Sequence, residues 1–236
     1  MNLILLEDND FTAAGRVRLA GSRARHVISV LKAGVGDELK VGRLGARVGR
    51  GRVTALGAGR VELEVTFTDL PPAPLPVILL LVLPRPKVLR RTLAAAVTMG
   101  VKQIYLLNAF RVEKSYWQSS RLEPRSLRET LLEALAQAGD TRLPEMVQVN
   151  RFRPFVEDQL PELAAGRQVL LLHPGAGDSA AGFRPHPPAL VAIGPEGGFI
   201  PFEVDLLRQA GLAPLSLGPR ILRVEQAVPA VLGRFL

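Results

Sequence analysis

A glycine-rich loop near the C-terminus has the residue types of a ligand-binding turn. Residues Gly194–Gly198, with the sequence Gly-Pro-Glu-Gly-Gly, directly follow the apolar run Leu190–Ile193. Two adjacent glycines after a strand let the backbone take positive φ and approach a ligand closely, while Pro195 stiffens the start of the turn. The alternative is a tight strand-to-helix turn without a ligand, which is the better interpretation of an isolated Gly-Gly pair.

A second loop, at residues 215–225, carries charged side chains. It runs from an apolar strand through Gly-Pro to Arg220 and Arg223, and then to Glu225 before the last expected helix. Ligands in open α/β sheets bind at the carboxyl ends of the strands, where these charges are expected to lie. Taken singly, Arg223 and Glu225 would be solvated charges at the start of a helix. Together with the glycine-rich loop they indicate a binding site.

The sequence argues against several common kinds of site. The Gly194–Gly198 loop has neither the Gly-x4-Gly-Lys-Ser/Thr pattern of a phosphate loop nor the Gly-x-Gly-x-x-Gly pattern of a dinucleotide site. The chain has no cysteine, which excludes disulfides, thiolate metal ligands and cysteine nucleophiles. Its three histidines, His26, His173 and His186, lack metal-ligand spacing, so we expect no metal-dependent mechanism.

The elements expected around both loops are apolar strands that alternate with helices. The expected strands lie at residues 77–83, 103–108, 147–149, 169–173, 189–194 and 214–218. The expected helices lie at residues 87–99, 124–138, 155–164, 201–210 and 224–235. This alternation predicts a mostly parallel sheet covered by helices on both faces, and therefore an α/β fold.

A Pro-rich segment at residues 70–76 is the clearest break in the chain. Closely spaced prolines favour an extended, semi-rigid connector over a helix or a central strand. We therefore predict two domains, at residues 1–70 and 77–236.

The first domain has the pattern of a small β-barrel. Alternating residues punctuated by glycines predict strands at residues 37–41, 47–55 and 61–68. One helix is expected at residues 22–31, with apolar residues at helical spacing. Because Arg23, Arg25 and Lys32 remain available for its surface, this helix is expected to present a basic edge.

The composition indicates a globular chain with a basic surface. Of the 236 residues 47% are hydrophobic, and 30 Lys and Arg against 22 Asp and Glu give a net charge of +8. The excess is mostly arginine, so a polyanionic partner and the bias of a GC-rich genome are both open explanations. The N-terminus lacks signal-peptide features and no apolar run is long enough to cross a bilayer, so we expect a cytoplasmic protein with no membrane partner.

The two loops, in this order and at this spacing, resemble a known family. The pattern Ile-Gly-Pro-Glu-Gly-Gly, an acidic helix, and Leu-Gly-x-Arg-Ile-Leu-Arg is typical of the bacterial 16S ribosomal RNA uridine-N3 methyltransferases, a branch of the SPOUT superfamily. It is matched at Ile193–Gly198 and Leu217–Arg223. Weaker matches extend over nearly the whole chain and include residues 26–31, Arg111 and Trp117.

The resemblance implies a fold, a cofactor and partners. The C-terminal domain would be a SPOUT α/β domain whose end forms a trefoil knot, a rare exception to unknotted topology. The first domain would be a PUA-like β-barrel that docks RNA. The methyl donor would be S-adenosylmethionine, with S-adenosylhomocysteine as the product. The partners would be 16S ribosomal RNA in the small ribosomal subunit and a second copy of the chain, joined through the knot domain.

The resemblance also implies which residues hold the ligands. Three loops would bind the cofactor through glycines and backbone amides, which agrees with the lack of a phosphate motif. The cofactor-binding residues would be Leu172, His173, Pro174, Gly194, Pro195, Glu196, Gly197, Gly198, Leu215, Leu217, Gly218, Arg220, Ile221, Leu222 and Arg223. The candidate RNA-binding residues are Arg23, Arg25, His26 and Lys32.

Four charged residues are candidates for catalysis. Methyl transfer from a sulfonium is a direct displacement, so the protein must align the reactants and make the acceptor electron-rich. Uridine N3 carries a weakly acidic proton, which calls for a base or for cations that stabilise the uridinate. Arg220 and Arg223 are candidates for that stabilisation or for phosphate anchoring. Glu196 and Glu225 are the candidate bases, and structural roles are equally open for both.

Three other side chains have competing interpretations. His173 ends a strand near the expected site, but the Pro-Gly that follows favours a turn residue lining the pocket. Tyr116 and Trp117 could stack on a flipped base, although packing or a dimer contact is the preferred interpretation.

Some positions depart from the family pattern. Where the family has Thr-Glu-Thr after the last arginine, this chain has Val224, Glu225 and Gln226, so two hydroxyl groups are missing near the expected site. Donor binding, which depends on glycines and backbone, is expected to survive this change. Two alternatives are kept for the function: methylation of another RNA, including a ribose 2′-hydroxyl, and a non-catalytic RNA-binding factor of ribosome assembly.

Overall fold

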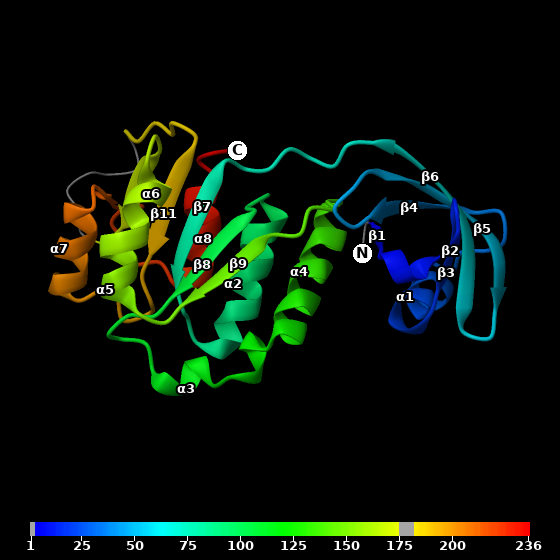
Figure 1. The fold of residues 1–236 in the computed structure, drawn as a ribbon, viewed down its shortest axis with the longest axis horizontal. Coiled ribbons are helices and arrows are strands. Elements are labelled where there is room, and N and C mark those ends of the chain that lie inside the picture. The colour runs from blue at the N-terminus through cyan, green and yellow to red at the C-terminus, as the bar shows by residue number, and fades with distance from the viewer. Residues whose placement is uncertain (1–2, 175–181) are drawn as a thin grey trace. The chain divides into compact units, whose positions relative to one another are not determined.

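The computed structural model describes residues 3–174 and 182–236, and contacts divide the chain into two compact units. The first contains Met1–Ala73 and Leu132–Leu143, and the second contains Pro74–Leu131 and Pro144–Leu236. Figure 1 shows a curled sheet in the first unit and a sheet flanked by helices in the second. The domain limits of 1–70 and 77–236 remain a prediction.

The first unit is built on a six-stranded sheet with the order β1-β4-β5-β6-β3-β2. Its strands are β1 (Ile4–Leu6), β2 (Phe11–Ala13), β3 (Arg16–Leu19), β4 (Glu38–Arg43), β5 (Val48–Gly57) and β6 (Arg60–Asp69). The sheet curls into a half-barrel with β1 and β2 at its edges. The strands predicted at 37–41, 47–55 and 61–68 are confirmed as β4, β5 and β6.

A short helical segment closes the core of this unit. Helix α1 (Gly21–Arg25) continues into a π-helical turn (His26–Val30), which confirms a helix near residues 22–31. Its Ala24 and Val27 are fully buried against Leu6, Leu19 and Leu63 of the sheet. A 3-10 turn (Asp8–Asp10) joins β1 to β2.

Gly49 shows why glycines recur in this sheet. A Cβ atom at Gly49 in β5 would lie 1.9 Å from the carbonyl oxygen of Thr66 in β6. The register between the two strands shifts at the same place. Because the two backbones approach so closely, only glycine fits, and this glycine serves strand packing and not a turn.

Residues Leu132–Leu143, which belong to the first unit, contact its N-terminal part through backbone hydrogen bonds. The Leu3 N–H donates to the Ala136 carbonyl at 2.9 Å, and the Gly45 N–H donates to the Thr141 carbonyl at 2.7 Å. Thr141, which is fully buried, also fills the space that a side chain at Gly42 would need. These contacts could not be predicted from the pattern of residues, because helical periodicity continues through residue 138.

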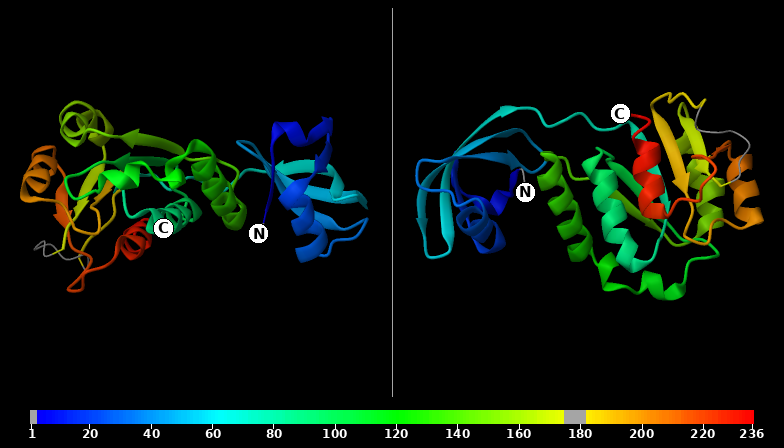
Figure 2. Two further views of the ribbon diagram at one scale, coloured as in Figure 1. Left: turned by 90° about the horizontal axis from the view of Figure 1, so that it is seen from below. Right: turned by 180° about the vertical axis from the view of Figure 1, so that it is seen from behind.

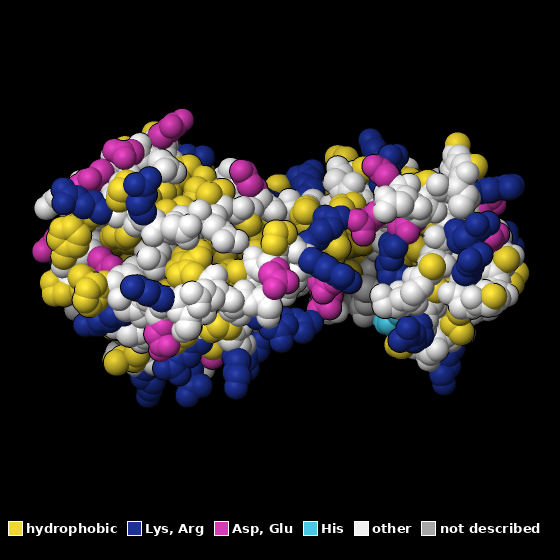
Figure 3. Space-filling view, turned by 60° about the horizontal axis from the view of Figure 1, so that its bottom comes forward, with side chains coloured by type: hydrophobic (Ala, Val, Ile, Leu, Met, Phe, Trp, Pro, Cys, Tyr) yellow, Lys and Arg dark blue, Asp and Glu magenta, His cyan; other side chains and the backbone are white. Residues whose placement is uncertain are grey.

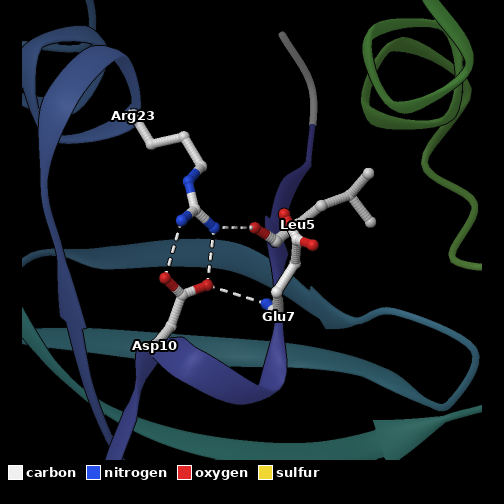
Figure 4. Close-up of polar contacts among 4 residues, drawn as sticks. All are labelled: Leu5, Glu7, Asp10 and Arg23. Carbon is white, nitrogen blue, oxygen red and sulfur yellow. Dashed lines mark hydrogen bonds and ion pairs between the residues drawn. The ribbon is translucent and has the colours of Figure 1, made fainter. Parts of the chain in front are cut away.

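Arg23 is bound to a buried carboxylate in the first unit. Its guanidinium donates to both carboxylate oxygens of Asp10, each at 2.6 Å, and to the Leu5 carbonyl at 2.9 Å (Figure 4). The Glu7 N–H also donates to Asp10, at 2.7 Å. Asp10 is only 6% exposed, so a complete set of donors is required to stabilise its charge. The group ties α1 to the end of β1.

The second unit contains a six-stranded sheet with the order β12-β10-β11-β7-β8-β9. Its strands are β7 (Val77–Val82), β8 (Gln103–Leu107), β9 (Glu145–Val149), β10 (Gln168–Leu172), β11 (Ala189–Ile193) and β12 (Ala213–Leu215). Every pair is parallel, so the predicted parallel sheet is confirmed. Each residue of β7 and β11 is buried, as expected for strands covered on both faces.

Helices cover both faces of this sheet. They are α2 (Pro86–Thr98), α3 (Lys114–Trp117), α4 (Pro124–Ala138), α5 (Phe152–Pro154), α6 (Leu160–Ala164), α7 (Pro201–Gln209) and α8 (Val224–Leu232), with a 3-10 turn (Ser120–Leu122) and a π-helical turn (Phe155–Gln159). The view from below in Figure 2 shows α6 on one face and α2 with α8 on the other. All five predicted helices are confirmed, with the last ending at Leu232 instead of 235.

Two expectations about the C-terminal part have different outcomes. The strand expected at 214–218 ends at Leu215, because the chain turns where Ser216 and Gly218 hydrogen-bond to each other. The trefoil knot stays a prediction. The connection from β10 to β11, which bears on the threading, includes residues 175–181, and these lie outside the described residues.

The buried pair in the first unit leads to a stability prediction. We expect Asp10→Ala to lower the free energy of unfolding by about 3 kcal/mol, because Arg23 would keep its charge without a partner. The matched control is Asp8→Ala, which removes a carboxylate 82% exposed and bound to Arg43, and is expected to cost less than about 1 kcal/mol. Chemical denaturation followed by circular dichroism measures both. Similar losses in the two variants would contradict the structural role of Asp10.

Candidate functional site

A cavity of about 210 Å³ lies at the carboxyl ends of β10, β11 and β12. Its walls come from the segments that follow these three strands, residues 172–174, 193–199 and 215–224, together with Ala227 of α8. Parallel pairing puts the three strand ends side by side, since β10 pairs with both β11 and β12. The His173 N–H extends the β10–β12 pairing by donating to the Leu215 carbonyl at 3.1 Å.

The structure brings the predicted cofactor-binding residues together around this cavity. All of them line it except Gly197. Their role as cofactor ligands stays a prediction. Five further residues line the cavity and were not among the predicted ligands: Ile193, Phe199, Ser216, Val224 and Ala227. The first four lie next to or within the predicted loops, so their closeness to the motifs could have identified them. Ala227 lines the cavity because of the way α8 packs, which the sequence alone does not show.

Two glycines of the loops have physical reasons to be glycine. A Cβ atom at Gly194 would lie 3.0 Å from two ring carbons of Phe199, a ring that in turn packs on Phe152. Gly218 has φ of +124°, which an L side chain rarely adopts. The loops therefore use glycine both for close packing and for a backbone turn beside the cavity.

Glu196 has a backbone partner outside its own loop. Its carboxylate accepts a hydrogen bond at 3.0 Å from the N–H of Arg85, the residue that caps the N-terminus of α2. This contact ties the glycine-rich loop to the connection between β7 and α2. Two roles, as a base and as a structural group, were left open for Glu196. The hydrogen bond to the Arg85 N–H supports the structural role. The role of Glu196 as a base stays a prediction.

Arg111 anchors the same loop from another side. Its guanidinium donates to the Gly197 carbonyl, and its Cδ atom would lie 3.1 Å from a Cβ atom at Gly197. The space next to Gly197 is thus filled by the arginine stem, which accounts for the absence of Gly197 from the cavity lining among the described residues. From the sequence, Arg111 is recognisable only as a weak match to the family pattern.

Glu203 is a buried carboxylate that the sequence analysis did not single out. It is 3% exposed and accepts hydrogen bonds from the Phe110 N–H at 2.7 Å and the Ile200 N–H at 3.0 Å. Glu203 lies in the first turn of α7, where the partial positive charge of the helix N-terminus interacts favourably with a carboxylate. Glu203 therefore fixes the segment after β8 against the start of α7.

The remaining catalytic candidates, Arg220, Arg223 and Glu225, differ in whether they line the cavity. Arg220 and Arg223 are exposed and line the cavity. Glu225 is half-buried in the first turn of α8 and is not among the residues that line the cavity in the described part of the chain. The Arg223 N–H donates to the Gln226 side chain at 3.1 Å, so Gln226 caps α8. Two cations, but not Glu225, thus face the cavity.

The candidate RNA-binding residues of the first unit differ in availability. Arg25 and Lys32 are exposed. Arg23 is partly exposed, and its guanidinium is ion-paired with Asp10. His26 is half-buried, and its Nε2 is a buried atom without a hydrogen-bond partner in the described structure. An RNA contact by any of the four stays a prediction.

Tyr116 and Trp117 are both engaged within the second unit. The Trp117 Nε1–H donates to the Asn108 side chain at 2.9 Å, which supports the packing role over stacking. The Tyr116 hydroxyl donates to Glu113 at 3.1 Å. Partial burial and then this hydrogen bond raise the pKa of Tyr116 above its usual value, so its phenol stays protonated near neutral pH.

The described residues contain no group of three or more His, Asp or Glu side chains that could hold a metal ion. Across the same part of the chain, none of the helices is long and apolar enough to cross a membrane.

Residues 71–236 match the model of a family described as the RNA methyltransferase domain. The chain belongs to this family. The matched region contains all three loops that line the cavity. The RNA methyltransferase domain thus begins in the Pro-rich segment and extends to the last residue of the chain.

Two curated relatives support the predicted resemblance. A protein of Treponema pallidum named ribosomal RNA small subunit methyltransferase E is 28% identical over 237 residues, covering 98% of this chain and 88% of the relative. A protein of the same name from Mycobacterium bovis is 27% identical over 218 residues, covering 90% of this chain and 83% of the relative. The family resemblance seen in the two loops is therefore confirmed.

Two solved structures share the fold. One is a methyltransferase of Legionella pneumophila in complex with the bound cofactor SAM, with a TM-score of 0.79, 23% identity and coverage of 99% of this chain and 96% of the other. The second is a ribosomal RNA small subunit methyltransferase E of Neisseria gonorrhoeae bound to S-adenosyl methionine, with a TM-score of 0.76, 22% identity and coverage of 99% and 95%. They confirm the predicted α/β fold class.

The buried carboxylate next to the cavity leads to a second stability prediction. We expect Glu203→Ala to lower the free energy of unfolding by about 3 kcal/mol, because two N–H groups would lose their acceptor. Glu203→Gln, which keeps one acceptor oxygen, is expected to lose less. Asp205→Ala, an exposed carboxylate of the same helix, is the control and is expected to change stability by no more than about 0.5 kcal/mol. Equal losses in the alanine variants, measured by chemical denaturation, would refute the role of Glu203.

Proposed function

We propose that the chain transfers a methyl group from S-adenosylmethionine to N3 of a uridine in 16S ribosomal RNA of the small subunit. The observation that supports this function most directly is that three loops line one cavity inside the matched RNA methyltransferase domain. Up to about forty residues of the chain separate these loops. We also propose that the protein works in the cytoplasm as a homodimer joined through its C-terminal domain.

The chemistry of the cavity suits the methyl donor. S-adenosylmethionine carries an adenine, a ribose and an amino acid group but no phosphate, so its site needs apolar walls and backbone hydrogen-bonding groups. Apolar side chains such as Leu172, Leu215 and Leu222 supply the walls, and the glycines beside them leave backbone atoms accessible. Two structures with the same fold carry this cofactor in their names.

The acceptor side of the proposal depends on arginine. Loss of the N3 proton to water leaves a negative charge shared with the flanking carbonyl oxygens of the base, and a nearby guanidinium stabilises that charge. Arg220 and Arg223 are the cations that line the cavity. The candidate bases have weaker support, since Glu196 is engaged with the Arg85 N–H and Glu225 is not a lining residue. Charge stabilisation by arginine is therefore the mechanism that we favour.

The two departures from the family pattern affect this proposal differently. Val224 is buried and lines the cavity, so a methyl group takes the place of a hydroxyl at the wall. Gln226, the third residue of α8, accepts the Arg223 N–H, which is the role that Glu or Gln performs in a capping box. The position of Arg223 is thus maintained, while one polar contact to a ligand is replaced by an apolar one.

Exposed cations suit a polyanionic substrate. Lys87, Arg90 and Arg91 of α2 are exposed, as are Arg220 and Arg223 beside the cavity. In Figure 3 lysine and arginine side chains gather along the lower edge of the second unit. Because cations that contact phosphates dominate the affinity of proteins for RNA, this edge is a suitable docking surface.

The function is tested by incubating the protein with labelled S-adenosylmethionine and small ribosomal subunits from a strain that lacks this methylation. We expect label in N3-methyluridine of 16S RNA, detected by nucleoside analysis. Label on a ribose would support methylation of another site. Donor binding without any transfer would support a non-catalytic assembly factor, and either result would overturn the proposal.

Arg223→Ala tests the catalytic role of arginine. We expect methyl transfer at saturating substrates to fall roughly 100-fold, because a charge-stabilising donor would be lost, while the dissociation constant for S-adenosylmethionine changes less than about threefold. The control is Arg208→Ala, an exposed arginine of α7 that does not line the cavity, which is expected to retain transfer. Isothermal titration and transfer assays measure both quantities. Equal losses of binding and transfer would remove the catalytic role.

A further inference from the structure

Phe110 is the most exposed aromatic side chain of the described residues. It is 78% exposed, compared with 53% for Phe202, and the tyrosines and the tryptophan are half-buried. Nothing in the mechanism proposed above uses it. Its position after the carboxyl end of β8 places it at the edge of the sheet where the cavity lies, because β8 runs parallel to β7 and β7 runs parallel to β11.

The backbone around Phe110 is held firmly although its side chain is free. Ala109 and Val112 are 6% and 9% exposed, and the Val112 N–H donates to the Ala109 carbonyl at 3.1 Å. These contacts define a tight turn with buried ends and with Phe110 and Arg111 at its tip. Before the turn, the Asn108 N–H donates to the Val149 carbonyl at 2.8 Å, which anchors the turn to β9.

Two further contacts join this turn to the loop that lines the cavity. The Phe110 N–H donates to the buried carboxylate of Glu203 at 2.7 Å, and the Arg111 guanidinium donates to the Gly197 carbonyl. Glu203 also accepts the Ile200 N–H, directly after the glycine-rich loop. The turn and the loop are thus one connected structure, and the ring of Phe110 projects from it into solvent.

We propose that Phe110 is a stacking platform for an unpaired nucleobase of the RNA substrate. A base whose N3 is to be methylated must leave its helix, and single-stranded bases are commonly received on aromatic faces. A phenyl ring has no hydrogen-bonding group, so it recognises the π-face of a base and not its identity. Arg111, exposed at the same tip, adds a cation that suits the neighbouring phosphate. This inference rests on the proposed RNA methylation.

The test compares variants of the full chain in steady-state transfer to unmethylated 16S RNA. We expect Phe110→Ala to raise the KM for RNA by roughly 5- to 150-fold, the range for loss of one base–aromatic stack. Turnover at saturating RNA and the affinity for S-adenosylmethionine are expected to stay within about twofold. Phe110→Trp is expected to retain a low KM, whereas Phe110→Leu, which is apolar but has no ring, is expected to resemble Phe110→Ala.

Leu70→Ala is the matched control, since Leu70 is also a large exposed apolar residue, at 68%, and is expected to leave the KM unchanged. An unchanged KM in Phe110→Ala, or full rescue by leucine, would overturn the proposal. So would loss of a dimer in Phe110→Ala, measured by light scattering, because the ring would then contact a second copy of the chain.

Failure of the proposed function can be told apart from failure of this inference. If the wild-type protein transfers no methyl group to 16S RNA, the proposed function fails. Direct binding of a fluorescently labelled 16S RNA fragment to the protein loaded with S-adenosylmethionine then decides the role of Phe110. Weaker binding by Phe110→Ala and not by Leu70→Ala would support the stacking platform, and equal binding by all three proteins would reject it.

Discussion

The parallel direction of all strands in the second sheet determines where its site lies. Parallel strands leave their carboxyl ends at one edge, so the segments after β10, β11 and β12 meet although they are far apart in the chain. The strands β7 and β11 are buried at every position, which requires helices on both faces. Each strand must then be followed by a turn into a helix or connection. The cavity consists of such turns, where backbone groups are not used by the sheet.

The charged groups near the cavity have separate tasks. Two carboxylates bind backbone N–H groups: Glu196 holds the N–H of Arg85 and Glu203 holds those of Phe110 and Ile200. Acidic groups thus position the loops, while Arg220 and Arg223 remain exposed at the cavity. Among the described residues, the charged side chains at the cavity are thus the exposed Arg220 and Arg223 and a Glu196 that accepts a backbone N–H.

Much of the fold could be predicted from local patterns. The features that could not be predicted are very short strands and contacts between residues that are distant in sequence. The strands β4, β5 and β6 have ten or fewer residues but clear alternation, whereas β1, β2 and β3 have three or four residues and too little pattern to be recognised. The contacts that fix the loops join residues far apart in sequence, such as Phe110 and Glu203, which are 93 positions apart. Arg23 looked like a free cation for the same reason, since its partner Asp10 lies thirteen positions away on another element.

The residues at the cavity differ in how much change they tolerate. Gly194 and Gly218 are fixed by packing and backbone conformation, so the cradle for a donor depends little on side-chain identity. Val224 and Gln226 show the opposite behaviour, because Val224 lines the cavity with a methyl group and Gln226 accepts the Arg223 N–H at the start of α8. Donor binding can therefore persist while side chains at the rim vary. Under the proposed function, recognition of the acceptor depends on the side chains at the rim and on the connected turns, and the turn at Phe110 contacts the glycine-rich loop directly through Arg111 and the Gly197 carbonyl.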